Sequence, residues 1–389
     1  SINKKILILI LFVAAFLRLA GLGSAELLFD ESFYSFRYIG WLDYLESPYQ
    51  TTPVQWLAPS VAEGSTLPKW LSLSFHDHPP LFFLIQKIFF SLFGDSLFVS
   101  RLPSAIFGIG FVYLTYLISR KLFSRSDLGD FKGQTLIAPL ITAISFAHVS
   151  LSRMAMMESV LFFFILLNIY YFLKLLGDRK HWLMFGLTFG LAMLTKYIAV
   201  FLIPTYFVFL LIYRRDLFKN PKIYLALIVS VLIFSPVIIY NIYSYKTFGH
   251  FDLQLSYLLN QKTPWPVSEF GGKTQDPFSR ITENLPAVFS IPFLIATLAG
   301  LILTILKYRK ELAFMLITLI FITLLLVETG SAIRFISLLV IPSVFFITAL
   351  ILFLWQKPYK FLSVGIILLS ITIGELYNYA FLRPDYGVV

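Results

Sequence analysis

Apolar runs of roughly 15 to 22 residues recur along almost the whole chain, separated by short charged clusters. Helices of that length cross the ~30 Å hydrocarbon core of a bilayer, where each backbone polar group must bond within its own segment. The runs lack the alternation of an outer-membrane barrel. With 58% hydrophobic residues, 13% charged residues and a mean hydropathy of +0.81, the chain is more apolar than a soluble domain. The sequence therefore predicts an all-α polytopic membrane protein.

The spacing of the runs predicts one integral membrane domain over residues 1–389, without a separate soluble domain. Two long non-apolar stretches, 23–96 and 243–285, are expected to be outer loops, the first with interfacial amphipathic helices. The first run is expected to remain as a helix rather than to be cleaved as a signal peptide. Zero cysteines exclude disulfides and thiolate metal sites. Eleven spans are predicted, at 6–22, 97–118, 135–150, 158–176, 182–195, 198–213, 223–242, 286–306, 312–328, 335–354 and 361–380.

The distribution of charge predicts the orientation of these spans. With Lys4 and Lys5 in the cytoplasm, the cytoplasmic segments hold 18 Lys and Arg and 5 acids, whereas the rest holds 13 and 16. This asymmetry is the one expected from the positive-inside rule. The net charge of +10 therefore reflects membrane topology and not nucleic-acid binding. We expect a multi-pass protein of the plasma or inner membrane with a cytoplasmic N-terminus.

For two apolar segments, length alone does not decide how they cross the membrane. If residues 81–93 crossed the membrane, every later loop would change sides and the charge asymmetry would be lost, so an interfacial or re-entrant outer helix is predicted after Pro79 and Pro80. As one helix, residues 182–213 would extend about 48 Å, too long for a comfortable span. Two short helices that turn near Thr195 and Lys196 are expected instead.

In this orientation the unusual polar residues gather on the outer side. Ionisable residues at membrane depth or at helix ends are costly, and they usually face a cavity, a partner or a substrate. The sequence therefore predicts an extracytoplasmic site. Its candidate residues are Asp30, Glu31, Asp77, His78, Arg153, Glu158, Lys196 and Arg334.

An acidic pair, Asp30 and Glu31, follows the first span where it should leave the membrane. Residues 32–45 have the pattern of an amphipathic helix lying on the membrane. The two acids could simply cap that helix by accepting hydrogen bonds from its first N–H groups. The functional interpretation is a general base at the membrane surface that takes a proton from an acceptor hydroxyl.

Residues 76–80 read His-Asp-His-Pro-Pro and offer two imidazoles and one carboxylate. A divalent metal needs three or four convergent ligands, which this segment supplies only with help from elsewhere. The alternatives are hydrogen bonds to a substrate, with His78 and Asp77 as candidates, and a structural loop. No obligatory cofactor is expected, and a divalent metal remains the open alternative.

Lys196 and Arg334 have no acidic sequence neighbours that would make simple surface pairs. Snorkelling toward the interface would explain both cations. If the two cations instead face acids across a cavity, they would bind a lipid phosphate, Arg through its planar fork and Lys as a point charge. Arg153 and Glu158 bracket an outer loop and either form a simple pair or contribute to the pocket, Glu158 as a second carboxylate.

An ordered set of short motifs over most of the first 215 residues resembles the GT-C class of integral-membrane glycosyltransferases. The similarity is to the branch of protein O-mannosyltransferases and the bacterial lipid A aminoarabinose transferase. The motifs are Asp30-Glu31, His78-Pro79-Pro80-Leu81, Arg101-Leu102-Pro103-Ser104-Ala105 with Gly108, Ser152-Arg153 with Glu158, and Gly190-Leu191-Ala192 with Thr195-Lys196-Tyr197.

The resemblance implies transfer of one sugar from a polyprenyl-phosphate donor to a protein, lipid or glycan hydroxyl, with inversion and without an obligatory metal. It implies that Asp30 is the base, with Glu31 beside it, and that Lys196 contacts the donor phosphate. Arg334 resembles a basic residue of the aminoarabinose transferases. Those enzymes have Lys where this chain has His78, and position 158 is more often Asp, so the pattern favours a mannosyltransferase-like donor. The absence of a Trp-Trp-Asp motif disfavours an oligosaccharyltransferase.

Two other functions are compatible with outer cations and acids. A transporter or flippase of lipid-linked sugars would need them too, but such sites usually lie at the midplane of repeated halves. No convincing repeat is present in the sequence. A catalytically silent assembly subunit is the other alternative, and activity measurements would separate it from an enzyme.

Overall fold

The computed structural model describes residues 2–28, 30–32, 34–35, 78–123, 133–259, 261, 276–329 and 332–381. All regular structure in these ranges is helical, which confirms the predicted fold class. The first part contains α1 (Ile2–Leu19), α4 (Leu81–Phe93), α5 (Leu97–Phe123), η4 (Gln134–Leu136), α6 (Ile137–Ile144), α7 (Phe146–Ser152), α8 (Glu158–Gly177), η5 (Arg179–His181), α9 (Trp182–Thr195), η6 (Tyr197–Phe201) and α10 (Leu202–Tyr213). The second contains η7 (Arg215–Lys219), α11 (Pro221–Phe248), α12 (Leu253–Leu258), α13 (Pro277–Val288), α14 (Ile291–Lys307), α15 (Ala313–Thr329), α16 (Ile333–Ile336), η9 (Ser337–Leu339), α17 (Val340–Trp355) and α18 (Lys360–Phe381).

Several helices have the length and apolar composition of membrane spans. Five of the described helices qualify, and the bent pair of residues 134–144 and 146–152 would make a sixth. The chain is therefore a multi-pass membrane protein. Four shorter apolar helices have 10–17 residues. Each of the eleven predicted segments contains a helix, while the number that cross the membrane stays a prediction.

Local sequence signals set several helix ends. Asn220 caps α11 by accepting a hydrogen bond from the Lys222 N–H at 3.2 Å, and Pro221 fills the first helical position. Gly249 ends the same helix with a φ of 77°, a conformation that favours glycine. Helix α9 ends at Thr195, and the extended backbone of Lys196 separates it from η6, where the sequence predicted a turn.

The structure corrects the predicted segments at three places. The span predicted at 135–150 bends by 58° at Ser145, where the freed Phe146 N–H donates to Glu375 Oε2 at 2.6 Å. The predicted loop 243–285 contains the end of α11, all of α12 and most of α13. The span predicted from residue 286 begins at Ile291, because α13 ends at Val288 and a new helix starts after Ser290. Tertiary contacts and polar amphipathic helices, which apolar run length does not report, account for these differences.

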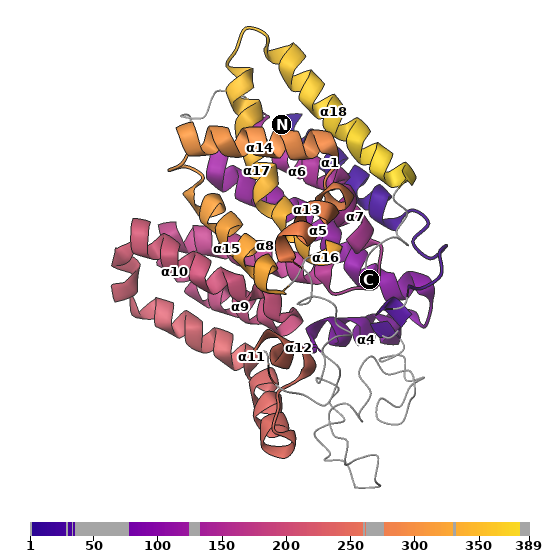
Figure 1. Ribbon diagram of the computed structural model, residues 1–389, viewed down its shortest axis with the longest axis vertical. Helices are drawn as coiled ribbons and strands as arrows, with labels where there is room; N and C mark the ends of the chain where they lie inside the picture. The colour runs from indigo at the N-terminus through magenta and orange to yellow at the C-terminus, as the bar shows by residue number, and fades with distance from the viewer. Residues whose placement is uncertain are drawn as a thin grey trace.

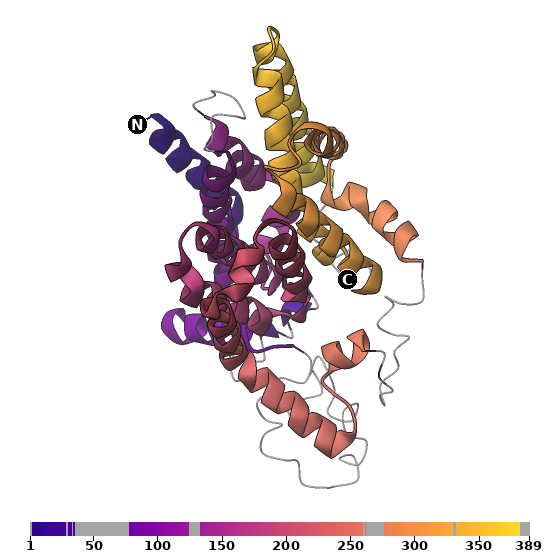
Figure 2. The ribbon, with the colours of Figure 1, turned by 90° about the vertical axis from the view of Figure 1, so that its left-hand side faces the viewer.

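The helices pack in two groups (Figure 1). In the first, α8 lies between α5 and α9, and α9 packs along α11. A Cβ at Gly186 would overlap the backbone of Ala226, so glycine permits the close approach of α9 and α11. In the second group, α14 packs against α17 and α18. Figure 2 shows this C-terminal group lying beside the N-terminal helices.

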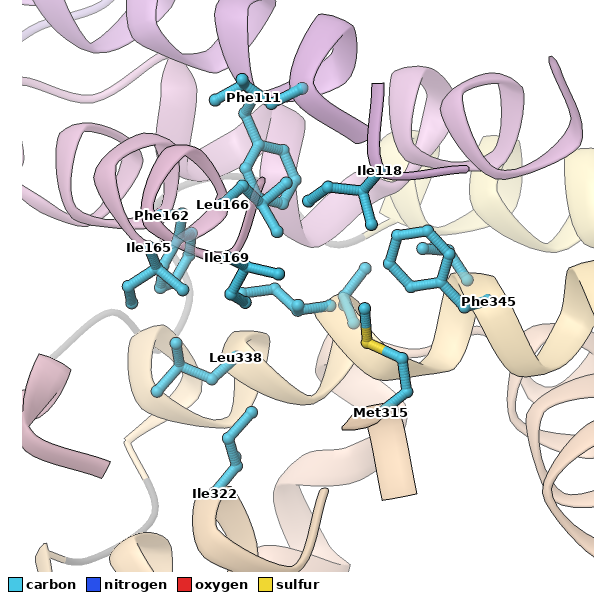
Figure 3. Packing of buried hydrophobic residues seen from close by; sticks show 14 of the residues in the cluster. Phe111, Ile118, Phe162, Ile165, Leu166, Ile169, Met315, Ile322, Leu338 and Phe345 are labelled. Carbon is cyan, nitrogen blue, oxygen red and sulfur yellow. The ribbon is translucent and has the colours of Figure 1, made fainter. Parts of the chain in front are cut away.

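A single apolar cluster joins the two groups of helices. Phe111 and Ile118 of α5 and Ile165 of α8 face Met315 of α15 and Phe345 of α17, all of them buried (Figure 3). Between helices in a bilayer, van der Waals contact between closely packed side chains stabilises such a core, because lipid tails are as apolar as these residues. This core fixes α16 and η9, at the start of α17, against the N-terminal half, and thereby positions the charged side chains described next.

Candidate active site

Four segments far apart in the sequence bring charged side chains into contact. They are residues 30–32, the first turn of α8, the break between α9 and η6, and α16. Because α8 and α9 are packed neighbours, the beginning of one lies near the end of the other. The structure therefore brings together four of the predicted site residues: Asp30, Glu158, Lys196 and Arg334.

The deeper contact is an ion pair between Lys196 and Glu158. The Lys196 Nζ lies 2.6 Å from Glu158 Oε1, and the two side chains are 2% and 1% exposed. Burial lowers the pKa of Lys196, and the Glu158 carboxylate opposes that effect. Glu158 Oε2 is also buried and, within the described ranges, has no hydrogen-bond partner. The pair thus keeps one acceptor oxygen available.

The shallower contact is an ion pair between Arg334 and Asp30. Arg334 Nη1 donates to Asp30 Oδ2 at 2.9 Å, and the side chains are 22% and 31% exposed. The Phe335 ring links the two ion pairs, since its centroid lies 4.8 Å from Lys196 Nζ and 5.3 Å from Arg334 Cζ. The two cations therefore share one aromatic ring, and each is paired with its own carboxylate, one pair buried and the other partly exposed.

Glu31 lies next to Asp30 but makes a different set of contacts. Arg101 binds it through two N–H···O bonds of 2.9 and 3.0 Å, and Glu31 also accepts from the Ala155 N–H at 2.6 Å and the Leu28 N–H at 2.9 Å. Its side chain is 0% exposed. Both oxygens are thus engaged with the protein, so these contacts support a positioning role, whereas the predicted catalytic role stays a prediction.

Arg101 is a site-forming residue that the sequence analysis quoted only as part of a motif. Besides Glu31, it donates to the carbonyls of Leu22, Ala25 and Glu26 at 2.7–3.0 Å. The guanidinium therefore ties the segment after α1 to α5. A motif Arg and a motif Glu were the available signals, but they lie 70 residues apart and the sequence alone does not show that they meet.

Arg153 binds the end of α1 and not Glu158. It donates to the carbonyls of Leu17, Ala20 and Gly21 at 3.0, 2.8 and 3.4 Å, where the negative end of the helix dipole favours a cation. Partial burial lowers its pKa, and the charge of Arg101 acts in the same direction. The alternative of a simple Arg153–Glu158 pair is wrong, because Lys196 occupies that place; a substrate contact of Arg153 stays a prediction.

His78 is buried among aromatic rings at the start of α4. Its ring lies 5.6 Å from that of Tyr34 and 6.4 Å from that of Phe83, both edge-on. Gln254 Nε2 of α12 lies 3.3 Å from His78 Nε2, and Figure 1 shows α4 and α12 next to each other. His78 thus joins the start of α4 to α12. Asp77 and His76 lie outside the described residues.

A polar network beside Lys196 holds α12 in place, and the sequence analysis missed it. Tyr197 OH donates to Asp252, and Asn241 Nδ2 donates to Asp252 Oδ2 at 2.8 Å. Asp252 also caps α12 by accepting from the Leu255 N–H at 2.8 Å. An Asp before a short apolar run was the only sequence signal for this cap.

In the described ranges, no group of three or more His, Cys, Asp or Glu side chains is arranged to hold a metal ion. The segment on which the sequence analysis placed a possible metal begins outside those ranges, so that alternative stays untested. The chemistry that the described residues support is recognition of an anion by two cations, next to carboxylates able to accept protons.

One known family matches a part of the chain that includes Glu158 and Lys196 of the site. Residues 77–240 match the dolichyl-phosphate-mannose-protein mannosyltransferase family. An uncharacterized protein of Aquifex aeolicus is 26% identical over 250 residues, covering 64% of this chain and 47% of its own length. A Bacillus subtilis protein with the provisional name mannosyltransferase YycA is 31% identical over 150 residues, covering 37% of this chain and 20% of its own length. The chain thus spans less than half of the length of these relatives.

Solved structures share the fold. ArnT from Cupriavidus metallidurans has a TM-score of 0.64 at 15% identity, over 95% of this chain and 63% of its own, in the apo state and bound to undecaprenyl phosphate. The archaeal oligosaccharyltransferase AglB from Archaeoglobus fulgidus has a TM-score of 0.60 at 14% identity, over 100% and 56%. Together with the family match, these structures confirm the resemblance to GT-C glycosyltransferases of the O-mannosyltransferase and aminoarabinose-transferase branch.

Proposed function

We propose that this chain transfers a single sugar from a polyprenyl-phosphate donor to an acceptor hydroxyl at the extracytoplasmic face of the membrane. The observation that carries the proposal is the joining of two ion pairs, Lys196–Glu158 and Arg334–Asp30, on the Phe335 ring. Two cations suit the phosphate of the donor. The more exposed carboxylate suits a base that an acceptor can reach.

The reaction follows from this division of roles. The acceptor hydroxyl gives its proton to the Asp30 carboxylate while its oxygen attacks the anomeric carbon, and the bond from that carbon to the phosphate oxygen breaks. The electron pair of the broken bond stays on the leaving phosphate. Lys196 and Arg334 stabilise that growing charge more strongly in the transition state than in the ground state. In-line attack inverts the anomeric centre.

The Arg334–Asp30 contact gives the donor a way to activate the base. While Arg334 donates to Asp30 Oδ2 at 2.9 Å, its guanidinium occupies the carboxylate that the acceptor hydroxyl would have to reach. A bound phosphate competes for the same guanidinium, so donor binding releases Asp30 next to the anomeric centre. Both groups are partly exposed, which makes this exchange less costly than separation of the buried pair.

Glu158 has a different role in the proposal. Its Oε1 holds Lys196 in place, and its buried Oε2, which has no hydrogen-bond partner among the described residues, is a ready acceptor for a hydroxyl of the donor sugar. Removal of water from such an acceptor is compensated only by a ligand with a donor group. A hexose with several hydroxyls meets that requirement.

The donor class is supported by the relatives. Undecaprenyl phosphate is bound to ArnT in one solved structure, and dolichol-phosphate is bound to AglB in another. The match to the mannosyltransferase family and the His at position 78, where aminoarabinose transferases have Lys, favour a mannose-like hexose. The acceptor is a protein, lipid or glycan hydroxyl.

The test uses the purified chain in proteoliposomes with a panel of radiolabelled polyprenyl-phosphate sugars and a membrane extract as the source of acceptors. We expect label to move from the lipid fraction to the acceptor with one sugar, most efficiently with a hexose. Asp30→Asn should abolish this transfer in folded protein. Label that crosses the bilayer while still attached to its lipid would indicate a flippase and contradict the proposal.

A further inference from the structure

A second candidate site lies on the flank formed by α9, α10 and α11, away from the ion-pair cluster. A pocket of about 160 Å³ lies there, which we call the lateral pocket. Phe185 of α9, Leu210 of α10 and Ile223 of α11 are among its buried lining residues. Its volume is similar to that of an apolar cavity of ~150 Å³ that stays dry and binds benzene, so it can hold part of a hydrocarbon chain.

The polar groups that line the lateral pocket are already satisfied by the protein. The Ser230 hydroxyl donates to the carbonyls of Gly186 and Ala226, both at 2.9 Å. The Tyr206 hydroxyl donates to Asn168 Oδ1 at 2.6 Å. With these hydroxyls engaged, the pocket offers a ligand little but apolar contact. Hydrocarbon is therefore the ligand class that fits it.

The lateral pocket opens to the outside of the helix bundle. Ile203 and Phe207 of α10 are 50% and 54% exposed, and Leu227 of α11 is 51% exposed, although all three line the pocket. In a membrane protein such exposed apolar side chains face lipid. The opening therefore admits a chain from the surrounding bilayer.

Basic side chains lie at one end of the lateral pocket. Phe218 and Ile223 line it, and the exposed Lys219 and Lys222 are their direct sequence neighbours. Arg214 is paired with Asp216 at 3.0 Å, but in the described ranges Lys219 and Lys222 have no ion-pair partner. Each basic residue near a membrane surface contributes attraction to anionic lipid. An apolar pocket with adjacent unpaired cations has the charge and shape of a phospholipid site.

We propose that the lateral pocket binds one acyl chain of an anionic phospholipid whose phosphate is held by Lys219 and Lys222. Lys219 ends η7 and Lys222 lies in the first turn of α11, both at the end of α10 opposite to Lys196, and the loop charges assign them to the cytoplasmic side. A polyprenyl-phosphate donor with its phosphate at Lys196 would leave both lysines without an anion. The site is therefore distinct from the proposed active site, and it serves a structural lipid of the cytoplasmic leaflet.

Native mass spectrometry of the purified chain tests this assignment, with dioleoyl phosphatidylglycerol and dioleoyl phosphatidylcholine, which share acyl chains but not charge. We expect preferential retention of phosphatidylglycerol. The double variant Lys219→Gln/Lys222→Gln should lower that retention roughly tenfold or more, to the phosphatidylcholine level. The matched control Arg309→Gln/Lys310→Gln removes two exposed charges from another predicted cytoplasmic loop and should leave it unchanged.

A second variant tests the apolar half of the site. Leu227→Trp enlarges a half-exposed side chain at the opening and should reduce retention of both lipids, with an unchanged thermal unfolding midpoint. Equal retention of the two lipids by the unsubstituted chain would overturn the proposal. The proposal would also be overturned if undecaprenyl phosphate displaced phosphatidylglycerol equally well from the unsubstituted chain and from the Lys219→Gln/Lys222→Gln variant. The occupant would then be a polyprenyl chain.

Discussion

Asp30 and Glu31 are neighbours in the sequence, but they belong to two different kinds of ion-pair cluster. Glu31 is fully buried, accepts two bonds from Arg101, and accepts two more from backbone N–H groups. Asp30 is 31% exposed and is paired with an Arg334 that is itself partly exposed. The first cluster is saturated with protein contacts, whereas the second can exchange a protein contact for a substrate contact.

The segment after α1 therefore contributes one carboxylate to a structural ion pair and the neighbouring one to the proposed active site. The Glu31–Arg101 pair ties the segment after α1 to α5 and to the loop before α8. The cluster of Asp30, Arg334, Lys196 and Glu158 lies on that fixed base and keeps a buried acceptor oxygen unpaired among the described residues. A rigid support beside ion pairs that a ligand can reach suits the electrostatic preorganisation that the proposed reaction needs.

The largest expected effect concerns the saturated cluster. Arg101→Ala leaves the buried Glu31 carboxylate without its cation, and we expect a loss of about 3–5 kcal/mol in unfolding free energy. Denaturant unfolding in detergent micelles measures it. Arg153→Ala is the matched control, since it removes a guanidinium whose hydrogen bonds in the described residues go to three carbonyls at and just after the end of α1, and it should cost less. Equal losses for the two variants would break the distinction between a saturated support and an ordinary cap.

The next effect concerns the cluster of Asp30, Arg334, Lys196 and Glu158, which we call the exchangeable cluster. Lys196→Met removes a cation that we assign to the donor phosphate, and kcat/KM for the donor should fall roughly 10- to 100-fold, as expected for one charged hydrogen bond. Initial rates at varied donor concentration measure this change.

A second substitution separates donor binding from simple structural damage by an unpaired carboxylate. The double variant Lys196→Met/Glu158→Gln removes that buried charge as well. We expect its stability to recover while its transfer stays low. Recovered transfer would mean that Lys196 serves only to neutralise Glu158, and it would contradict the phosphate contact.

The smallest effect concerns the network that holds α12 beside the cluster. Tyr197→Phe removes one hydrogen bond to Asp252, while the bonds from Asn241 and the Leu255 N–H remain. We expect a loss of about 1 kcal/mol and faster hydrogen exchange in α12, with transfer reduced less than tenfold. A larger loss of transfer with unchanged exchange would give Tyr197 a direct part in the reaction and enlarge the exchangeable cluster.

Run length and charge were sufficient to predict the helical architecture. The bounds of α9 and α4 coincide with the segments predicted at 182–195 and 81–93, because each is an apolar run with a clear break at its ends. Helix α13 was missed because it is amphipathic, with polar and apolar residues interspersed, and so gives no continuous apolar run. The bend at Ser145 was also missed, since its freed N–H binds Glu375, 229 residues away.

The composition of the cluster was accessible from the sequence, but its pairing was not. Topology placed Asp30, Glu158, Lys196 and Arg334 on one side of the membrane, and the structure brings them into contact. Which cation meets which acid depends on how the helices cross. Sequence proximity suggested Arg153 as the partner of Glu158, whereas Lys196, 38 residues away, is the partner. The different roles of Asp30 and Glu31 likewise depend on Arg101, 70 residues away.

In the proposed reaction Asp30, and not Glu31, is the base. The direct measurement compares the transfer rate of Asp30→Asn and Glu31→Gln from a saturating polyprenyl-phosphate hexose, normalised to folded protein. We predict that Asp30→Asn keeps the stability of the unsubstituted chain and loses transfer at least about 100-fold, while Glu31→Gln loses stability but keeps transfer within several-fold per folded molecule. Undiminished transfer by Asp30→Asn, or complete loss confined to Glu31→Gln, would contradict the account.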